Sequence, residues 1–244
     1  MSAGTKEISI KRAFTYFAFF ALMLYLATRQ AIPMLNEWGF HPAISWFISS
    51  GLLIFVPLFI IAIRNTRKEL QTHNKKLILD RLWLTKPTSK DWVWAIGGAV
   101  LIIILTGIIM WVAEWTSQAL FDQPFKTSPS FMHFEPLKSG QYWILGVWLI
   151  FFFFNIFGEE IMWRGYILAG MSDNYPKTAW LYNAAFWMMF HIPFGIELMI
   201  MVLPTFFLVP YLVQKRRNTW IGIIIHAGLN GPGFILVSLG ILNH

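Results

Sequence analysis

Two adjacent glutamates, Glu159 and Glu160, lie inside a long apolar stretch and are the residues best suited to chemistry. Arg164 follows four residues after Glu160. On an α-helix this spacing puts Glu160 and Arg164 on one face, where they can pair, and rotates Glu159 about 100° away. The spacing predicts one carboxylate that is neutralised by arginine and a second that is left for another role. The plainer interpretation is a structural salt bridge with a spare glutamate, but an unneeded carboxylate in an apolar setting is costly.

Two of the six histidines, His191 and His226, also fall inside apolar stretches. His191 stands alone among aromatic residues, which is more often the setting of a satisfied core histidine than of a functional one. His226 and Asn230 are one helical turn apart on the same face, an arrangement typical of hydrogen bonding between helices or of a polar pocket. Taken one at a time, neither motif identifies a reaction.

Together, a free carboxylate, two imidazoles and an amide provide the groups that hydrolysis requires. A carboxylate can take a proton from water, a histidine can hold that water, and a second histidine and an amide can donate hydrogen bonds to an oxyanion. A serine or cysteine nucleophile is disfavoured because the chain has no Cys and no Gly-x-Ser-x-Gly sequence. Zinc is the second choice, since Glu159, His191 and His226 suffice in number but the His-Glu-x-x-His spacing is missing. We therefore expect no cofactor, with zinc as the alternative.

The composition shows which class of protein must position these groups. Of the 244 residues, 57% are hydrophobic and 13% are charged, whereas a soluble domain has about 25% charged residues. A soluble fold of this length could not cover 23 Phe, 13 Trp and 11 Met. The apolar content is incompatible with disorder, and the lack of Cys excludes a disulfide-stapled secreted domain. An integral membrane protein is the class that remains.

A helix that crosses a bilayer needs about 20 predominantly apolar residues. Seven stretches qualify, so we expect an all-α polytopic bundle with seven or eight transmembrane helices. The fourth stretch is too long for one crossing, so either it tilts or its last turns lie in space lined by protein. The predicted spans cover residues 13–32, 43–63, 92–115, 141–169, 178–195, 197–214 and 219–241.

Basic residues are distributed unequally between the predicted loops. With a cytoplasmic N-terminus, 16 of the 19 lysines and arginines fall on the cytoplasmic side or at its edge, as the positive-inside rule requires. The exceptions are Arg29, Lys126 and Lys138. The basic loop at 64–91 then serves topology and contact with anionic lipids, and we expect no nucleic-acid partner.

The three motifs are expected at a similar depth in the membrane. At 1.5 Å per helical residue, Glu159, His191, His226 and Asn230 lie about 10–20 Å from the cytoplasmic ends of three different spans. Ionisable side chains are expensive inside a bilayer, and unrelated structural residues would not be expected to share one level. We therefore predict a single intramembrane site that opens toward the cytoplasm.

The three motifs carry a resemblance to a known family. Glu-Glu-x-x-x-Arg, aromatic-x-x-x-His and His-x-x-x-Asn, in this order on successive late spans, resemble the CPBP (Abi) family of type II CAAX prenyl endopeptidases and bacteriocin-processing or self-immunity proteins. The resemblance covers residues from about 150 to 235. One position departs from the family pattern, because Trp187 stands where the family has Phe. A change between two large aromatic residues predicts tolerated packing.

The resemblance implies an intramembrane endopeptidase and a role for each matching residue. Glu159 matches the glutamate that activates water, and His191 matches its partner on that water. His226 and Asn230 match the groups proposed to form the oxyanion hole. The supporting pair of the family is matched by Glu160 and Arg164.

The implied partners are the lipid bilayer and a membrane-bound or lipidated peptide or protein substrate. The compactness of the chain favours a prokaryotic plasma membrane as the expected location. The sequence predicts one membrane domain over 1–244, in which 13–115 form three N-terminal spans and 141–241 form a four-span catalytic core. Substrate identity and oligomeric state are not predicted. Two other functions stay open: a non-catalytic immunity or scaffold protein, and an ion-coupled transporter, for which no matching helix breaks occur in the first half.

Overall fold

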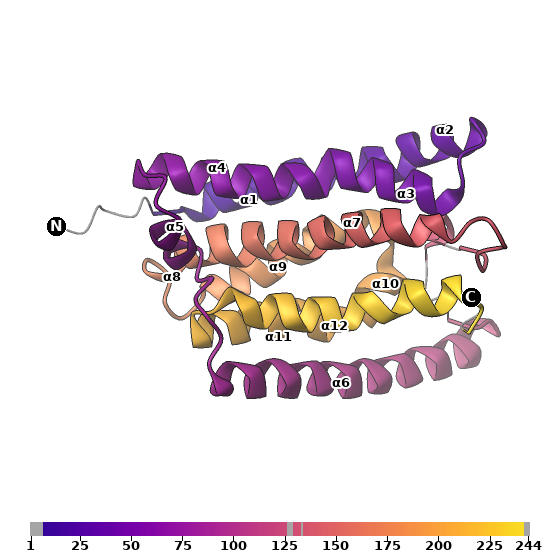
Figure 1. Ribbon diagram of the computed structural model, residues 1–244. Coiled ribbons are helices and arrows are strands. Elements are labelled where there is room, and N and C mark those ends of the chain that lie inside the picture. Colours follow the sequence, from indigo (N-terminus) through magenta and orange to yellow (C-terminus); the bar gives the residue numbers. More distant parts are fainter. Residues whose placement is uncertain (1–6, 126–128, 133, 242–244) are drawn as a thin grey trace.

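The protein is a bundle of helices that run roughly parallel to one long direction (Figure 1). The computed structural model describes residues 7–125, 129–132 and 134–241, and within these ranges it contains helices and no strand. A helix satisfies its backbone hydrogen bonds within one segment, which is what the interior of a bilayer requires. The predicted all-α class is confirmed.

The N-terminal half supplies three long helical stretches, two of which contain a π-helical turn. Near the start of the second stretch, Pro42 occupies the first helical position, where its missing N–H costs nothing. The elements are α1 (Ile10–Leu26), η1 (Ala27–Ala31), α2 (Ile32–Glu37), α3 (Pro42–Ser50), η2 (Gly51–Phe55), α4 (Val56–Leu70), α5 (Lys75–Arg81) and α6 (Ser89–Phe121).

The C-terminal half contains one long helical stretch, three short helices and a final long helix. The long stretch, Trp143–Ser172, is continuous. Every residue of its π-helical part is buried, so its last turns are surrounded by protein, which is one of the two arrangements expected for the long fourth stretch. The elements are η3 (Ser130–Met132), α7 (Trp143–Glu159), η4 (Glu160–Leu168), α8 (Ala169–Ser172), α9 (Ala179–His191), η5 (Ile192–Phe194), α10 (Ile196–Met201), α11 (Leu203–Arg216) and α12 (Thr219–Ser238).

Five helical stretches of the described chain are long and apolar enough to cross a membrane, against the seven or eight that we expected. They are Ile10–Glu37, Pro42–Leu70, Ser89–Phe121, Trp143–Ser172 and Thr219–Ser238.

The other two predicted spans form shorter helices. Stretch 178–195 becomes α9, with 13 residues, and 197–214 becomes α10 followed by α11, with 14 residues. Pro193 and Gly195 lie between α9 and α10 and interrupt the helix there; Gly195 has a φ of 95°. At about 20 Å, α9 and α11 are each shorter than a hydrocarbon core of about 30 Å. The count of seven is therefore not confirmed.

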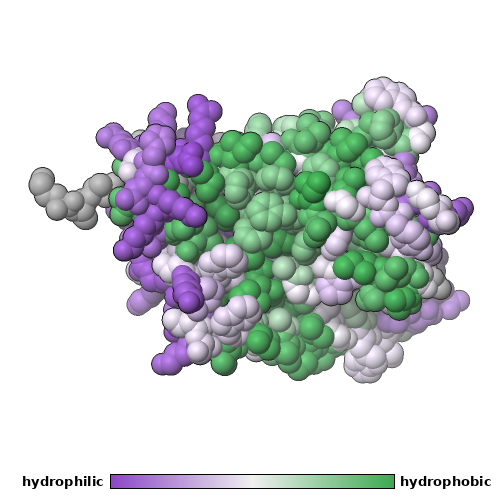
Figure 2. Space-filling view, viewed as in Figure 1, coloured by the Kyte–Doolittle hydropathy of each residue, from purple (hydrophilic) through white to green (hydrophobic). Residues whose placement is uncertain are grey.

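The surface supports an integral membrane protein. On the face shown in Figure 2, hydrophobic residues form a broad band across the middle of the bundle, and hydrophilic ones gather toward its two ends. The end of α4 and the short α5 lie at the same end as the start of α1 (Figure 1). Exposed side chains such as Trp111, at 72%, and Ile103, at 59%, belong to α6, which lies at the edge of the bundle.

The motif-bearing helices occupy the interior. The stretch α7–η4 packs against α4 on one side and α12 on the other, and α9 packs against α1 and α11. At Gly158 the backbone of η2 approaches so closely that an added Cβ would overlap the carbonyl oxygen of Phe55. This close contact holds the start of the Glu-Glu motif against the N-terminal half.

Candidate active site

The two glutamates lie at the junction between α7 and η4, where the helix changes from α to π. π-helical turns are rare and occur frequently at functional sites. Glu159 is 3% exposed and Glu160 is fully buried. Both carboxyl groups are therefore removed from bulk water and must find their partners within the protein.

Glu160 has two cationic or polar partners on one oxygen. Its Oε1 lies 3.2 Å from Nη1 of Arg164, the i,i+4 ion pair that the sequence predicts, and 3.0 Å from Nδ1 of His226. Its Oε2 is buried without a hydrogen-bond partner among the described residues. Gly222 of α12 permits this arrangement, since a Cβ there would overlap Oε2. Glu160 thus joins η4 to α12.

Arg164 is also fully buried, and its guanidinium lies over the ring of Trp187 at 3.5 Å from the centroid. A guanidinium over an aromatic face gains from the negative potential of the ring, and tryptophan provides the strongest interaction. Arg164 therefore uses both Glu160 and an aromatic ring to offset the loss of water.

Glu159 has a different environment, as the sequence predicts for the second carboxylate. Its Oε1 accepts a hydrogen bond from Nδ2 of Asn155 at 3.0 Å, and its Oε2 accepts one from Nε1 of Trp187 at 2.9 Å. Each carboxylate oxygen can accept more than one hydrogen bond. Glu159 is therefore held by two N–H donors and keeps acceptor capacity for a water molecule.

His191, the last residue of α9, is half-buried beside Trp187. Its Nδ1 lies 2.9 Å from the backbone carbonyl oxygen of Trp187. Because a carbonyl can only accept, Nδ1 carries the proton in this contact and the other ring nitrogen, Nε2, has a free lone pair. The rings of Phe194 and Phe206 lie 5.3 and 5.0 Å away between centroids.

The two residues of the third motif, His226 and Asn230, differ in burial. His226 is 4% exposed and lies edge-to-face with Trp187 at 5.8 Å between centroids. Asn230, one turn farther along α12, has an exposed side chain. Glu159, His191 and His226 are therefore gathered around Trp187, as expected for one site, and Asn230 lies at an exposed position next to them.

Two residues in contact with Glu159 were not among the predicted site residues. Asn155 lies four residues before Glu159, so the same i,i+4 rule that pairs Glu160 with Arg164 could have found it. Trp187 is the position that departs from the family pattern, and a reading of this change as packing alone leaves out its indole N–H, which donates to Glu159. Neither contact follows from the three motifs alone.

The donor groups do not fit the zinc alternative in the arrangement described. Among the residues that the structure places, no three His, Asp or Glu side chains come together as a metal-binding group. Nδ1 of His226 is directed at Glu160, and Nδ1 of His191 at a backbone carbonyl. We derive no step through zinc, and the expectation of no cofactor stays a prediction.

The comparisons with known proteins concern the same part of the chain. Residues 141–231 match the family model described as "Type II CAAX prenyl endopeptidase Rce1-like". The matched region runs from the start of α7 into α12 and contains all three motifs. Neither the curated proteins nor the solved structures yielded a match. Over residues 141–231, which are less than half of the chain, the protein is similar to this family of CAAX-type membrane proteases, and the three motifs lie in that region.

Proposed function

We propose that the protein is a glutamic intramembrane endopeptidase that hydrolyses a peptide bond of a membrane-associated substrate. The observation that carries the proposal is the division of labour between the two glutamates. Glu160 is occupied by Arg164 and His226, whereas Glu159 is held only by the neutral donors of Asn155 and Trp187. A carboxylate without a cationic partner of its own is the one suited to act as a base.

In the proposed reaction, Glu159 accepts a proton from a water molecule as the water oxygen attacks the carbonyl carbon of the substrate. The free Nε2 of His191 accepts a hydrogen bond from the same water and orients it. The carbonyl oxygen becomes an oxyanion. Glu159 then returns the proton to the amide nitrogen, and the carbon–nitrogen bond breaks to give an amine and a carboxylic acid, which releases its proton to become the carboxylate product.

His226 and Asn230 are the proposed oxyanion donors. As an imidazolium, His226 would donate through Nδ1–H to Glu160 and through Nε2–H to the oxyanion, and Asn230 would donate through its amide. The exposed position of Asn230 supports entry of the substrate from that side of α12. Fixed donors of this kind contribute about 100- to 1000-fold each to kcat.

The substrate class follows from the family and from the position of the site. A CAAX-type protease family implies a membrane-associated, prenylated protein substrate. The positive-inside rule supports a cytoplasmic N-terminus and a site that opens toward the cytoplasm. We propose a prokaryotic plasma membrane as the location, as the compact chain suggests.

The substitution Glu159→Gln tests the proposal because it keeps the shape of the side chain and removes the base. In the first assay, the purified protein in lipid vesicles is given a quenched fluorescent peptide with a prenylated CAAX end. In the second, membranes from cells that express either form are compared by mass spectrometry for cleaved peptides. We expect a loss of at least about 1000-fold in kcat, with an unchanged melting temperature. Activity that survives chelators and does not respond to added zinc is expected for the glutamic mechanism.

The alternatives predict other outcomes. An immunity or scaffold protein would keep its biological effect with Gln at position 159 and would release no new peptide in either assay. An ion-coupled transporter would show an ion flux across the vesicle membrane that Glu159→Gln removes. Full cleavage by Glu159→Gln would contradict the proposed function.

A further inference from the structure

We infer that Trp187 positions the carboxylate of Glu159 for its reaction, and that it does so through its indole N–H rather than through its aromatic bulk. The inference rests on the proposed function of Glu159. It concerns the one motif position at which this chain departs from its family, since phenylalanine has no N–H to donate. Trp187 is therefore more than a tolerated change in packing.

The contact itself is short and buried. Nε1 of Trp187 donates to Oε2 of Glu159 at 2.9 Å, while Nδ2 of Asn155 donates to Oε1 at 3.0 Å. One donor comes from α9 and the other from the same helix as Glu159. Donors on both oxygens fix the rotation of the carboxylate, which a single donor would leave free. The indole N–H can make no other kind of contact, because it is only a donor.

The same indole contacts the rest of the site through its ring. Arg164 lies over its face at 3.5 Å from the centroid, and His191 and His226 meet it edge-to-face at 5.4 and 5.8 Å. A phenylalanine ring could also pack against these three residues. The hydrogen bond to Glu159 is thus the part of the arrangement that requires tryptophan.

Trp187 is a positioning residue and not a catalytic one. It is 1% exposed, so a bound peptide cannot reach it and it must act through Glu159. Loss of its N–H should therefore lower kcat and leave KM unchanged. A purely structural role would instead lower the amount of folded enzyme without changing the kcat of the molecules that fold.

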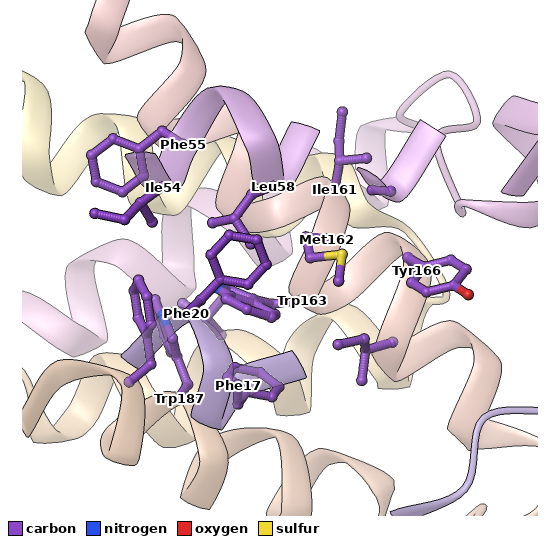
Figure 3. Packing of buried hydrophobic residues seen from close by; sticks show 14 of the residues in the cluster. Phe17, Phe20, Ile54, Phe55, Leu58, Ile161, Met162, Trp163, Tyr166 and Trp187 are labelled. Carbon is purple, nitrogen blue, oxygen red and sulfur yellow. The ribbon is translucent and has the colours of Figure 1, made fainter. Parts of the chain in front are cut away.

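The chain provides a matched control in Trp163. This tryptophan is fully buried on η4 and stacks on Phe17 at 3.9 Å between centroids. Figure 3 shows it within the apolar cluster, beside Phe17 and Phe20. Its indole N–H has no hydrogen-bond partner among the described residues. Changing it to phenylalanine removes the same atoms from a buried site but no contact with Glu159.

The kinetic experiment compares Trp187→Phe with Trp163→Phe on the prenylated CAAX peptide in vesicles. A hydrogen bond to a charged group corresponds to about a 10- to 100-fold change in rate. We expect Trp187→Phe to lower kcat by this factor with KM within about twofold of wild type, and Trp163→Phe to change neither by more than about threefold. Equal kcat values for the two variants would overturn the inference.

A spectroscopic measurement keeps the inference testable even if Trp187→Phe folds poorly or the peptide is not cleaved. In the wild-type protein labelled with ¹⁵N-tryptophan, magnetisation transfer from neighbouring side chains identifies the indole N–H signals of Trp187, beside His191, and of Trp163, beside Phe17, so the assignment does not depend on either variant. A hydrogen bond to a carboxylate moves an N–H proton signal downfield. We expect Glu159→Gln to shift the Trp187 signal upfield and to leave the Trp163 signal in place.

The two proposals fail in different ways. An unmoved Trp187 signal in Glu159→Gln overturns the role of Trp187, whatever the enzyme does. Undiminished cleavage by Glu159→Gln contradicts the proposed function, while a shifted Trp187 signal still establishes the contact. An inactive Glu159→Gln variant together with a fully active Trp187→Phe variant overturns this inference alone.

Discussion

Two glutamates of this protein with little-exposed side chains, Glu69 at 5% and Glu160 at 0%, are paired with arginines. They differ in how many of their carboxylate oxygens have a partner. Glu69, near the end of α4, has an acceptor contact on each oxygen: Oε1 with the hydroxyl of Tyr166 at 2.6 Å and Oε2 with Arg81 at 3.3 Å. A second arginine, Arg12, lies 3.4 Å from Oε1. This cluster joins α1, α4, α5 and η4 at one end of the bundle.

Glu160 lies deeper and is less completely satisfied. Among the described residues, its Oε2 has no hydrogen-bond partner, and neither do Nε and Nη2 of Arg164, although both side chains are fully buried; in the Glu69 cluster it is Nε of Arg81 that has none. Unsatisfied polar atoms in a protein interior require an explanation, because each is costly. The Glu69 cluster has the properties of a structural clamp at one end of the bundle. The Glu160 cluster also joins two helices, but Glu160 is the first residue of η4, next to Glu159, and the unpaired buried atoms of this cluster set it apart from the clamp.

The largest effect on stability is expected when one partner of the buried ion pair between Glu160 and Arg164 is removed. Glu160→Leu leaves the buried guanidinium of Arg164 without its carboxylate, and removal of one partner of a buried pair costs about 3–5 kcal/mol. The free energy of unfolding in detergent measures the loss. The double variant Glu160→Leu with Arg164→Met should recover most of it, because a buried pair can be replaced by apolar residues of similar size. A single variant within about 1 kcal/mol of wild type would contradict the buried pairing.

A smaller effect is expected from Gly222→Ala, which tests how closely α12 approaches Glu160. The added Cβ would overlap Oε2 of Glu160 and must displace it. Overpacking of this kind costs about 2 kcal/mol, and we expect kcat to fall with it because His226 shares that carboxylate. The control is Gly228→Ala on the same helix, where a Cβ meets nothing within 4 Å. That variant should gain about 0.5–1 kcal/mol.

The smallest effect is expected at the clamp. Glu69→Gln keeps an acceptor oxygen for Tyr166 but weakens the contacts with Arg12 and Arg81, at a cost of about 1 kcal/mol in the free energy of unfolding. We expect kcat within about twofold of wild type, since Glu69 is outside the proposed active site. A loss of kcat as large as that of Gly222→Ala would remove the distinction between the two clusters.

Much of the candidate site could be predicted because its first contacts are local. The pairing of Glu160 with Arg164 follows from helical spacing, and it is present at 3.2 Å. The different environment of Glu159 follows from its rotation about the same helix. The roles of these residues in catalysis stay predictions.

Other features depended on how helices meet. The contact of His226 with Glu160 and that of Trp187 with Glu159 each join residues far apart in the sequence. Helix spacing does not fix the rotation of one helix against another, so neither contact could be predicted. The exposure of Asn230 also depends on which neighbours cover α12 at that height.

The sequence by itself determined the helical class, the membrane environment and the residues that are chemically able to form a site, because composition and periodicity follow directly from residue order. Only the tertiary structure decided that Trp187 donates to Glu159 at the centre of the site and that Oε2 of Glu160 faces α12 at Gly222, because packing between segments far apart in the sequence sets both contacts.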